Sequence, residues 1–193
     1  MKILGRSSSI NVRKVLWTCA ELDIAFEHVE NDEALLARNP NAMVPVIQDD
    51  DFVLWESNAI CRYLAGKYPR STLLPEEPRA RALVEQWMDW QATELNASWR
   101  YAFLALVRRS PEHTRARDIA VSISSWHRHM RIIDEHLARG GQFITGEFFT
   151  LADVVLGLAT HRWLLSPLER PHLHSLLGYY QRLFVRPAFR AHG

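Results

Sequence analysis

The chain contains few cysteines and no long apolar segment. Its two cysteines, Cys19 and Cys61, lie far apart and form no CxxC pair, so the sequence predicts neither a zinc cage nor a disulfide scaffold. No apolar run approaches the roughly 18–20 residues that a membrane-spanning helix needs. The opening residues also lack the apolar core of a secretion signal. We therefore expect a cytoplasmic protein without a membrane partner.

The chain also has no large excess of positive or negative charge. Lysine and arginine number 23 against 22 acidic residues, which leaves a net charge of +1. Nucleic-acid partners are not expected, because such surfaces are strongly basic. The nine histidines form no HExxH pattern, and pairs two positions apart, such as His127 and His129, diverge on a helix. We expect no metal site. What remains is an ordinary globular composition, 48% hydrophobic and 23% charged.

The first third of the chain has short alternating elements. Apolar residues of 11–22 recur at helical spacing, whereas the apolar runs 43–47 and 52–54 flank three consecutive aspartates, which is typical of a hairpin. Ser57 is a suitable N-cap for the helix that follows. The predicted order is β-α-β-(short α)-β-β-α. The expected strands cover 2–4, 24–29, 43–47 and 52–54, and the expected helices cover 11–22, 33–38 and 57–68.

The rest of the chain has a helical pattern. Three prolines within 69–78 exclude a regular helix, so we expect a linker there. Apolar residues in steps of three and four then predict long helices, the first of them with Leu83, Trp87 and Trp90 on one face. Thr150 and Asp153 predict a helix cap, and Pro171 the first turn of the last helix. Helices are expected over 79–109, 115–139 and 150–165, and a last one from 171. The two expected domains cover 1–68 and 79–193. The inward residues of the last helix are expected to be Leu173, Leu176, Leu177, Tyr180 and Phe184.

Four short motifs, spread in order over nearly the whole chain, carry a family resemblance. They are Ser-Ile-Asn-Val-Arg-Lys-Val at 9–15, Met-Val-Pro-Val at 43–46, Leu-Trp-Glu-Ser-Asn-Ala-Ile at 54–60 and Phe-Thr-Leu-Ala-Asp at 149–153. With the element order they resemble the cytosolic glutathione transferases, with the Ser/Asn-type N-terminal motif of theta- or nu-like bacterial members. The resemblance implies an α+β fold, in which a thioredoxin-like βαβαββα domain that binds glutathione precedes an all-α helical bundle. It further implies a homodimer, a role in detoxification and glutathione as co-substrate, with no other cofactor.

The resemblance also implies how glutathione binds. A cis bond between Val44 and Pro45 turns the Val44 backbone outward, so that it pairs with the cysteinyl unit. Glu56 is placed to accept the ammonium of the γ-glutamyl group in a charge-assisted hydrogen bond. Ser57, at the start of a helix, is placed to bind the carboxylate of that group.

The loop after the first strand is where the family activates the glutathione thiol. A free thiol has a pKa near 8.5, so only a few per cent is ionised at pH 7. One hydrogen bond to a charged group contributes about 1.5–3 kcal/mol, most of what a two-unit decrease in pKa requires. Ser9 has the position of the donor in the hydroxyl classes, and Asn11 is the rival donor because a related bacterial group has Thr-x-Asn there. A simple serine turn is the third reading. Arg13 is either a charge near glutathione or an ordinary solvated helix residue.

Two further sets of residues have predicted roles. The segment 30–42 is shorter than in the family and normally helps to hold the glycine end of glutathione, so Arg38 and Asn41 are weak substitutes. The second substrate is expected to be a small hydrophobic electrophile, since the family's co-substrates are apolar. The candidate residues of its pocket are Trp99, Tyr101, Phe103 and Trp163, and core packing explains each of them equally well.

The leading function is a glutathione transferase that ionises glutathione for attack on a small apolar electrophile. One alternative is a non-catalytic binding or interaction protein with the same fold, because the short segment 30–42 weakens the site. The other alternative is a glutathione-dependent disulfide or peroxide reductase that works through Asn11.

Overall fold

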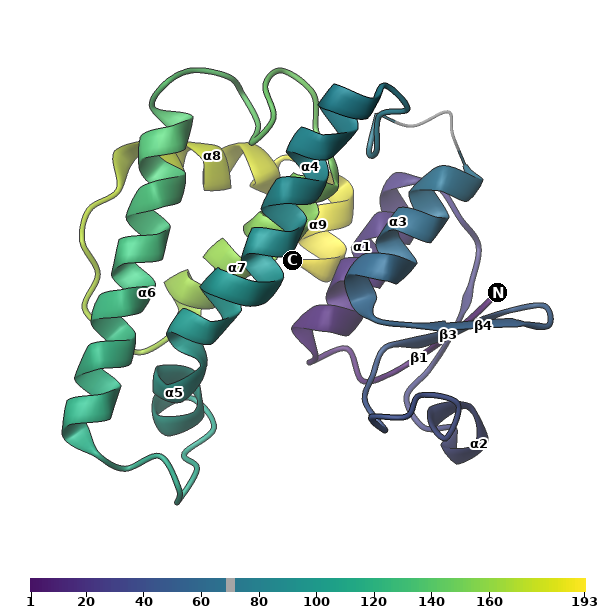
Figure 1. The fold of residues 1–193 in the computed structure, drawn as a ribbon, viewed down its shortest axis with the longest axis horizontal. Coiled ribbons are helices and arrows are strands. Elements are labelled where there is room, and N and C mark those ends of the chain that lie inside the picture. Colours follow the sequence, from purple (N-terminus) through teal and green to yellow (C-terminus); the bar gives the residue numbers. More distant parts are fainter. Residues whose placement is uncertain (69–71) are drawn as a thin grey trace. The chain divides into compact units, whose positions relative to one another are not determined.

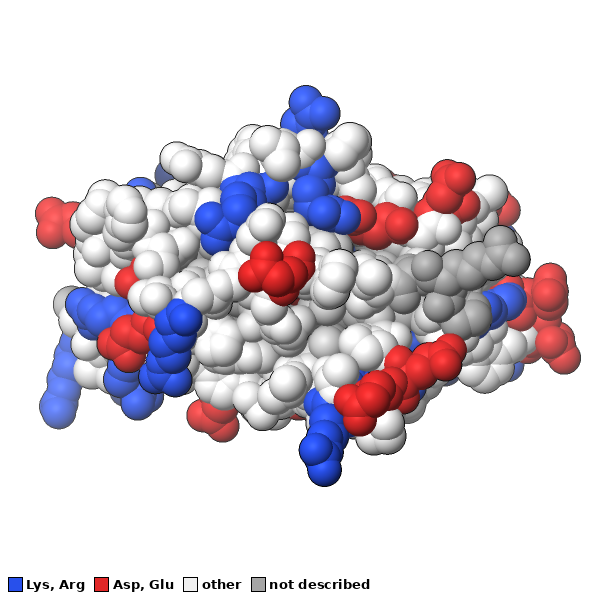
Figure 2. All heavy atoms as spheres, turned by 90° about the horizontal axis from the view of Figure 1, so that it is seen from above, with Lys and Arg blue, Asp and Glu red and all other residues white. Residues whose placement is uncertain are grey.

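A computed structural model describes residues 1–68 and 72–193 of the chain. It forms two compact units, one made of Met1–Arg81 with Phe184–Gly193 and the other of Ala82–Leu183 (Figure 1). The predicted linker 69–78 lies partly outside the described residues, and the boundaries of the two predicted domains stay predictions. On the face drawn in Figure 2, basic and acidic side chains are interspersed among uncharged ones, in keeping with the net charge of +1.

The first unit is built on a four-stranded mixed sheet. Its strands are β1 (Lys2–Leu4), β2 (Glu27–Val29), β3 (Val46–Asp49) and β4 (Phe52–Trp55), in the order β2-β1-β3-β4. β1 runs parallel to β2 and antiparallel to β3, and β3 and β4 form the predicted hairpin. The helices are α1 (Ile10–Glu21), α2 (Glu33–Leu36) and α3 (Ser57–Lys67). The thioredoxin-like element order is confirmed, although β2 and α2 are shorter than predicted and β3 begins later.

Each face of the sheet has its own core. Leu4 and Val46 pack with Leu35 of α2 on one face. Because side chains alternate along a strand, Ile3 and Ile47 point to the opposite face, where α1 and α3 lie together (Figure 1). All of these side chains are buried. The sheet is therefore fixed from both sides, but α2 is only four residues long and covers less of its face.

The C-terminal helix α9 (Pro187–His192) belongs to the first unit and packs on α1. The ring of Phe189 lies 4.8 Å from that of Trp17. Glu21, near the end of α1, accepts hydrogen bonds from both Trp17 and Arg186. The ion pair of Glu21 and Arg186 therefore connects α1 to the residue before α9, and Glu21 also binds the indole N–H of Trp17.

The second unit is helical. Its elements are α4 (Pro78–Trp90), the π-helical turn η1 (Gln91–Leu95), α5 (Asn96–Leu106), α6 (Ala116–Leu137), α7 (Leu151–Leu165) and α8 (His174–Phe184). The predicted helix 79–109 is thus three consecutive pieces. Of the face predicted for this helix, Trp87 is buried but Leu83 is 53% exposed, because the buried line of α4 runs through Val84, Trp87 and Met88.

The interior of this unit is formed around α7, most of whose residues are buried. The apolar residues in steps of three and four along 115–139 include the buried residues of α6 Trp126, Met130, Ile133 and Leu137. The prediction for Pro171 was wrong, since α8 begins at His174, where the backbone N–H of Leu176 donates to Asp134. Phe184 is exposed, and Tyr179 and Leu183 are buried in α8 instead.

Candidate functional site

The register of the sheet brings three predicted site segments to one edge. Leu4 pairs with Val46 and Val46 pairs with Trp55, so these three residues form one row across β1, β3 and β4. β1 and β4 end at this row, whereas antiparallel β3 begins there. The loop after β1, the residues before β3 and the connection from β4 to α3 therefore lie at the same edge.

Gly5 sets the path of the loop that follows β1. Its φ is +139°, and a Cβ atom at this position would lie 2.5 Å from Cγ2 of Val12 and 2.8 Å from Cβ of Val44. Only glycine allows the loop to approach both neighbours this closely. The loop then leads to Ser9, which has extended backbone angles and directly precedes α1. Its side chain makes no capping hydrogen bond in the described part of the chain, and Asn11 lies half-buried in the first turn.

The peptide bond between Val44 and Pro45 is cis, as predicted. A buried asparagine that sequence reasoning missed holds the turn before it. The Asn39 side chain donates to the carbonyl of Met43 at 2.8 Å and accepts from the backbone N–H of Asn41 at 3.0 Å. Asn41 itself is exposed. Through these two hydrogen bonds to nearby backbone groups, the side-chain amide of Asn39 fixes a loop that has no regular structure.

The connection from β4 to α3 is a single residue, Glu56. Its φ of 73° and ψ of 110° are unusual for a residue with a side chain and cost on the order of 1 kcal/mol or more. Turning from a strand into a helix in one residue requires such a conformation. Glu56 is the N-cap of α3 and is exposed, while Ser57 is the buried first residue of the helix. The prediction of Ser57 as the N-cap was therefore wrong by one position.

Two basic neighbours on α1 have separate partners. Arg13 donates through Nε to the carbonyl of His192 at 2.7 Å, which places part of its guanidinium against α9. Lys14 is 1% exposed, and its ammonium donates to Oδ1 of Asn58 in α3 at 3.2 Å. Sequence reasoning missed this buried ammonium, because a lysine on a helix is usually solvated.

The structure divides the four candidate residues of the electrophile pocket. Trp99 and Phe103 lie together, with the guanidinium of Arg162 4.5 Å and 4.4 Å from the centres of their rings. Tyr101 instead contacts His113. Trp163 is 1% exposed and belongs to the core. Of the four candidates, Trp99 and Phe103 therefore lie together, and the guanidinium of Arg162 beside them was not predicted from the sequence.

Other kinds of site find little support in the described residues. These contain no group of three or more His, Cys, Asp or Glu side chains that could hold a metal ion, and none of the helices found there has the length and hydropathy to cross a membrane. Burial raises the pKa of Cys19 to about 12 and that of Cys61 to about 11. Both thiols are therefore protonated at neutral pH and serve as packing groups.

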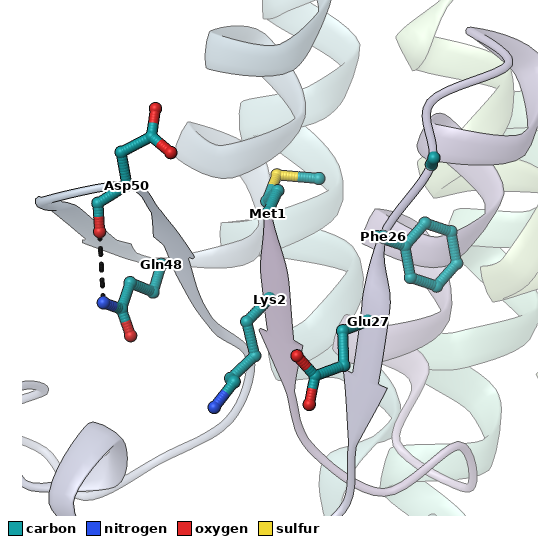
Figure 3. A pocket seen from close by; sticks show the side chains of 7 residues that line it. Met1, Lys2, Phe26, Glu27, Gln48 and Asp50 are labelled. Atoms are coloured by element: carbon teal, nitrogen blue, oxygen red, sulfur yellow. Dashed lines mark hydrogen bonds between the residues drawn. The ribbon is translucent and has the colours of Figure 1, made fainter.

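A polar hollow of about 540 Å³ lies at the other end of the sheet (Figure 3). Glu27, Lys2 and Gln48 form a row across three strands, in register, and Gln48 donates to the carbonyl of Asp50. Lys2 and Leu4 point to the same face, where Leu4 packs with Leu35 of α2 and the ammonium of Lys2 lies 3.6 Å from the carboxylate of Asp32, the N-cap of α2. The hollow lies at the end of β1 away from Ser9.

Comparisons with known proteins agree with this geometry. Residues 4–76 match the family described as glutathione S-transferase, N-terminal domain. Glutathione S-transferase GstB of Escherichia coli is 36% identical over 196 residues, 96% of this chain and 94% of that protein. A theta class glutathione S-transferase from Xanthomonas axonopodis pv. citri, solved with glutathione bound, superposes with a TM-score of 0.89 at 38% identity, covering 99% of this chain and 95% of that one. A probable elongation factor 1-gamma 2 of Arabidopsis thaliana is 30% identical over 80% of this chain but only 38% of its own length.

Proposed function

The chain belongs to the cytosolic glutathione S-transferase family and is a glutathione transferase, and we propose that it ionises glutathione at the edge of the sheet for attack on small apolar electrophiles. The observation that carries the proposal is the convergence there of the Ser9 loop, the cis Val44-Pro45 bond and the start of α3. The relative from Xanthomonas axonopodis holds glutathione on the same fold.

We assign the two ends of the γ-glutamyl group to the start of α3. The first backbone N–H groups of a helix have no partner within the helix and attract a carboxylate. Ser57 is the first residue of α3, and the exposed carboxylate of Glu56 precedes it. The unusual backbone of Glu56 places opposite partners, a carboxylate and a helix N-terminus, on adjacent residues. A zwitterionic amino acid group requires both.

The thiol is assigned to Ser9. Ser9 directly precedes α1 in the loop after β1 and is half-buried, and its O–H is a donor that can bond a thiolate. A single such bond contributes about 1.5–3 kcal/mol, which lowers the thiol pKa by roughly one to two units. The thiolate then forms a C–S bond with the electrophile as the leaving group departs with its electron pair, and the thiol proton passes to solvent. Asn11, in the first turn of α1, is the competing donor.

The test compares Ser9→Ala with Asn11→Ala, and Ser8→Ala serves as an exposed serine control. Loss of Ser9 is expected to reduce turnover with an aryl halide roughly 10- to 1000-fold. The ultraviolet absorbance of bound thiolate should then appear at higher pH, with little change in glutathione affinity. If Asn11→Ala is the more damaging change, Asn11 is the donor and the reductase alternative gains support. Full activity in both variants would refute the proposed activation.

We also propose that the second substrate contacts Trp99 and Phe103, and that two copies of the chain associate through α3 and α4. The support for the first is the paired, half-buried rings beside Arg162. The support for the second is Leu83, an exposed leucine on α4 that the interior of its own unit does not use.

A further inference from the structure

Lys14 is an ammonium that the interior of the first unit encloses. It lies on α1 and is 1% exposed, with its backbone carbonyl accepting from Thr18 and its Nζ donating to Oδ1 of Asn58. Removing a charge from water is unfavourable unless partners compensate for it. A methionine of similar length would fill the same space without that penalty. The presence of a charge here therefore indicates a task beyond packing.

The charge lies behind the N-terminal turn of α3. Asn58 is the second residue of that helix and directly follows Ser57. The ammonium also influences Cys61, one turn further along, where it opposes the increase in thiol pKa that burial causes. Between them, Asn58 and Cys61 place Lys14 against the first turn of α3, on the side that faces α1. The solvent side of the same turn begins with Glu56.

We propose that Lys14 is a positioning residue for the γ-glutamyl carboxylate of glutathione. Its ammonium holds Asn58, and with it the first turn of α3, and adds a full buried positive charge to the partial charge of the helix N-terminus. Buried charges are screened less by solvent and salt than surface charges, so the effect reaches the carboxylate through the turn. The inference rests on the proposed glutathione site and adds a residue that does not touch the ligand.

The neighbouring Arg13 cannot substitute for it. Successive residues of a helix point about 100° apart, and Arg13 donates to the carbonyl of His192 in α9. The two adjacent basic residues therefore serve different ends of the unit. Arg13 contributes to docking α9, whereas Lys14 contributes to the start of α3.

The test is a cycle of two variants and two ligands. Lys14→Met removes the charge and keeps the length, and Lys67→Met is the matched control on α3, where the ammonium binds Asp49 at the surface. Glutathione is compared by calorimetry with γ-aminobutyryl-cysteinylglycine, which lacks only the γ-glutamyl carboxylate. We expect Lys14→Met to weaken glutathione binding roughly 10-fold and to leave binding of the analogue nearly unchanged. The KM for glutathione should rise while kcat at saturation is retained. Lys67→Met should change neither affinity.

Lys14→Gln provides a second test should Lys14→Met fail to fold, because it removes the charge and keeps an N–H donor, one bond shorter, near Asn58. The same selective loss is expected. If a folded Lys14 variant loses affinity equally for both ligands, or for neither, Lys14 has only a structural role and the inference is wrong. If the wild type itself does not distinguish glutathione from the analogue, the proposed site at α3 fails instead.

Discussion

Asp153 provides a sharp test of how the second unit is held together. Its carboxylate is fully buried and accepts from the backbone N–H of Thr150 at 2.8 Å, as the predicted cap requires. It also accepts from the backbone N–H of Ile144 at 2.9 Å and from the hydroxyl of Tyr179 at 3.1 Å. One side chain thus joins the start of α7, the preceding loop and α8.

The expected cost of Asp153→Ala follows from these contacts. Loss of a helix cap costs about 1 kcal/mol. The variant also leaves the Ile144 N–H and the Tyr179 hydroxyl without this partner, at about 1–3 kcal/mol for each buried donor. We therefore expect a decrease of about 3–7 kcal/mol in the free energy of unfolding, measured in urea by tryptophan fluorescence. Thr150→Ala should cost only about 0.5–2 kcal/mol.

The pH dependence gives a second measurement. Burial raises the pKa of Asp153 from 3.8 to about 6, although its hydrogen bonds oppose the increase. The folded protein therefore holds this proton more tightly than the unfolded chain does. The resulting stabilisation is complete below about pH 4 and is lost as the pH rises through about 6, by roughly 3 kcal/mol in total. Asp153→Asn should abolish this part of the profile, while the more exposed Asp118→Asn should keep it. An unchanged profile in Asp153→Asn, or a cost below 1 kcal/mol for Asp153→Ala, would refute the reasoning.

Two further outcomes are expected. Gly5→Ala should lower both the melting temperature and glutathione affinity, because its Cβ would meet Val12 and Val44 at less than 3 Å and its φ is unfavourable for alanine; wild-type values would show that the loop is less constrained. Light scattering should give twice the chain mass of 22.4 kDa, and Leu83→Glu should shift the protein toward monomer. A wild-type monomer at micromolar concentration would contradict the proposed association.

Local patterns predicted most elements but not their partners. The steps of three and four along α6 identified its buried face, since helical periodicity reports directly on burial. In α8 the same spacing admits two neighbouring stripes, and the structure buries Tyr179 and Leu183 where Tyr180 and Phe184 were expected. Tyr179 is selected by its hydrogen bond to Asp153, which no pattern within the helix encodes.

The candidate site divides in a similar way. The cis bond at Pro45 followed from the family resemblance, and the order of the strands brought the three motifs to one edge. The pair of Lys14 and Asn58 could not be predicted, because a basic residue on a helix usually indicates a solvated face. The packing of α9 on α1 was also not predicted, because charged residues are usually expected to face solvent. It depends on Glu21 and Arg186, two charged residues from opposite ends of the chain.

The turn before Pro45 has two supports even though the segment 30–42 is short. Asn39 still anchors the carbonyl of Met43, and Gly5 still lies against Val44, so the turn before Pro45 keeps its supports without a longer α2. The polar row at Lys2 lies at the opposite end of β1. The hollow at that end therefore lies away from the edge at which we propose the reaction. The backbone expected to meet the cysteinyl unit keeps a rigid base.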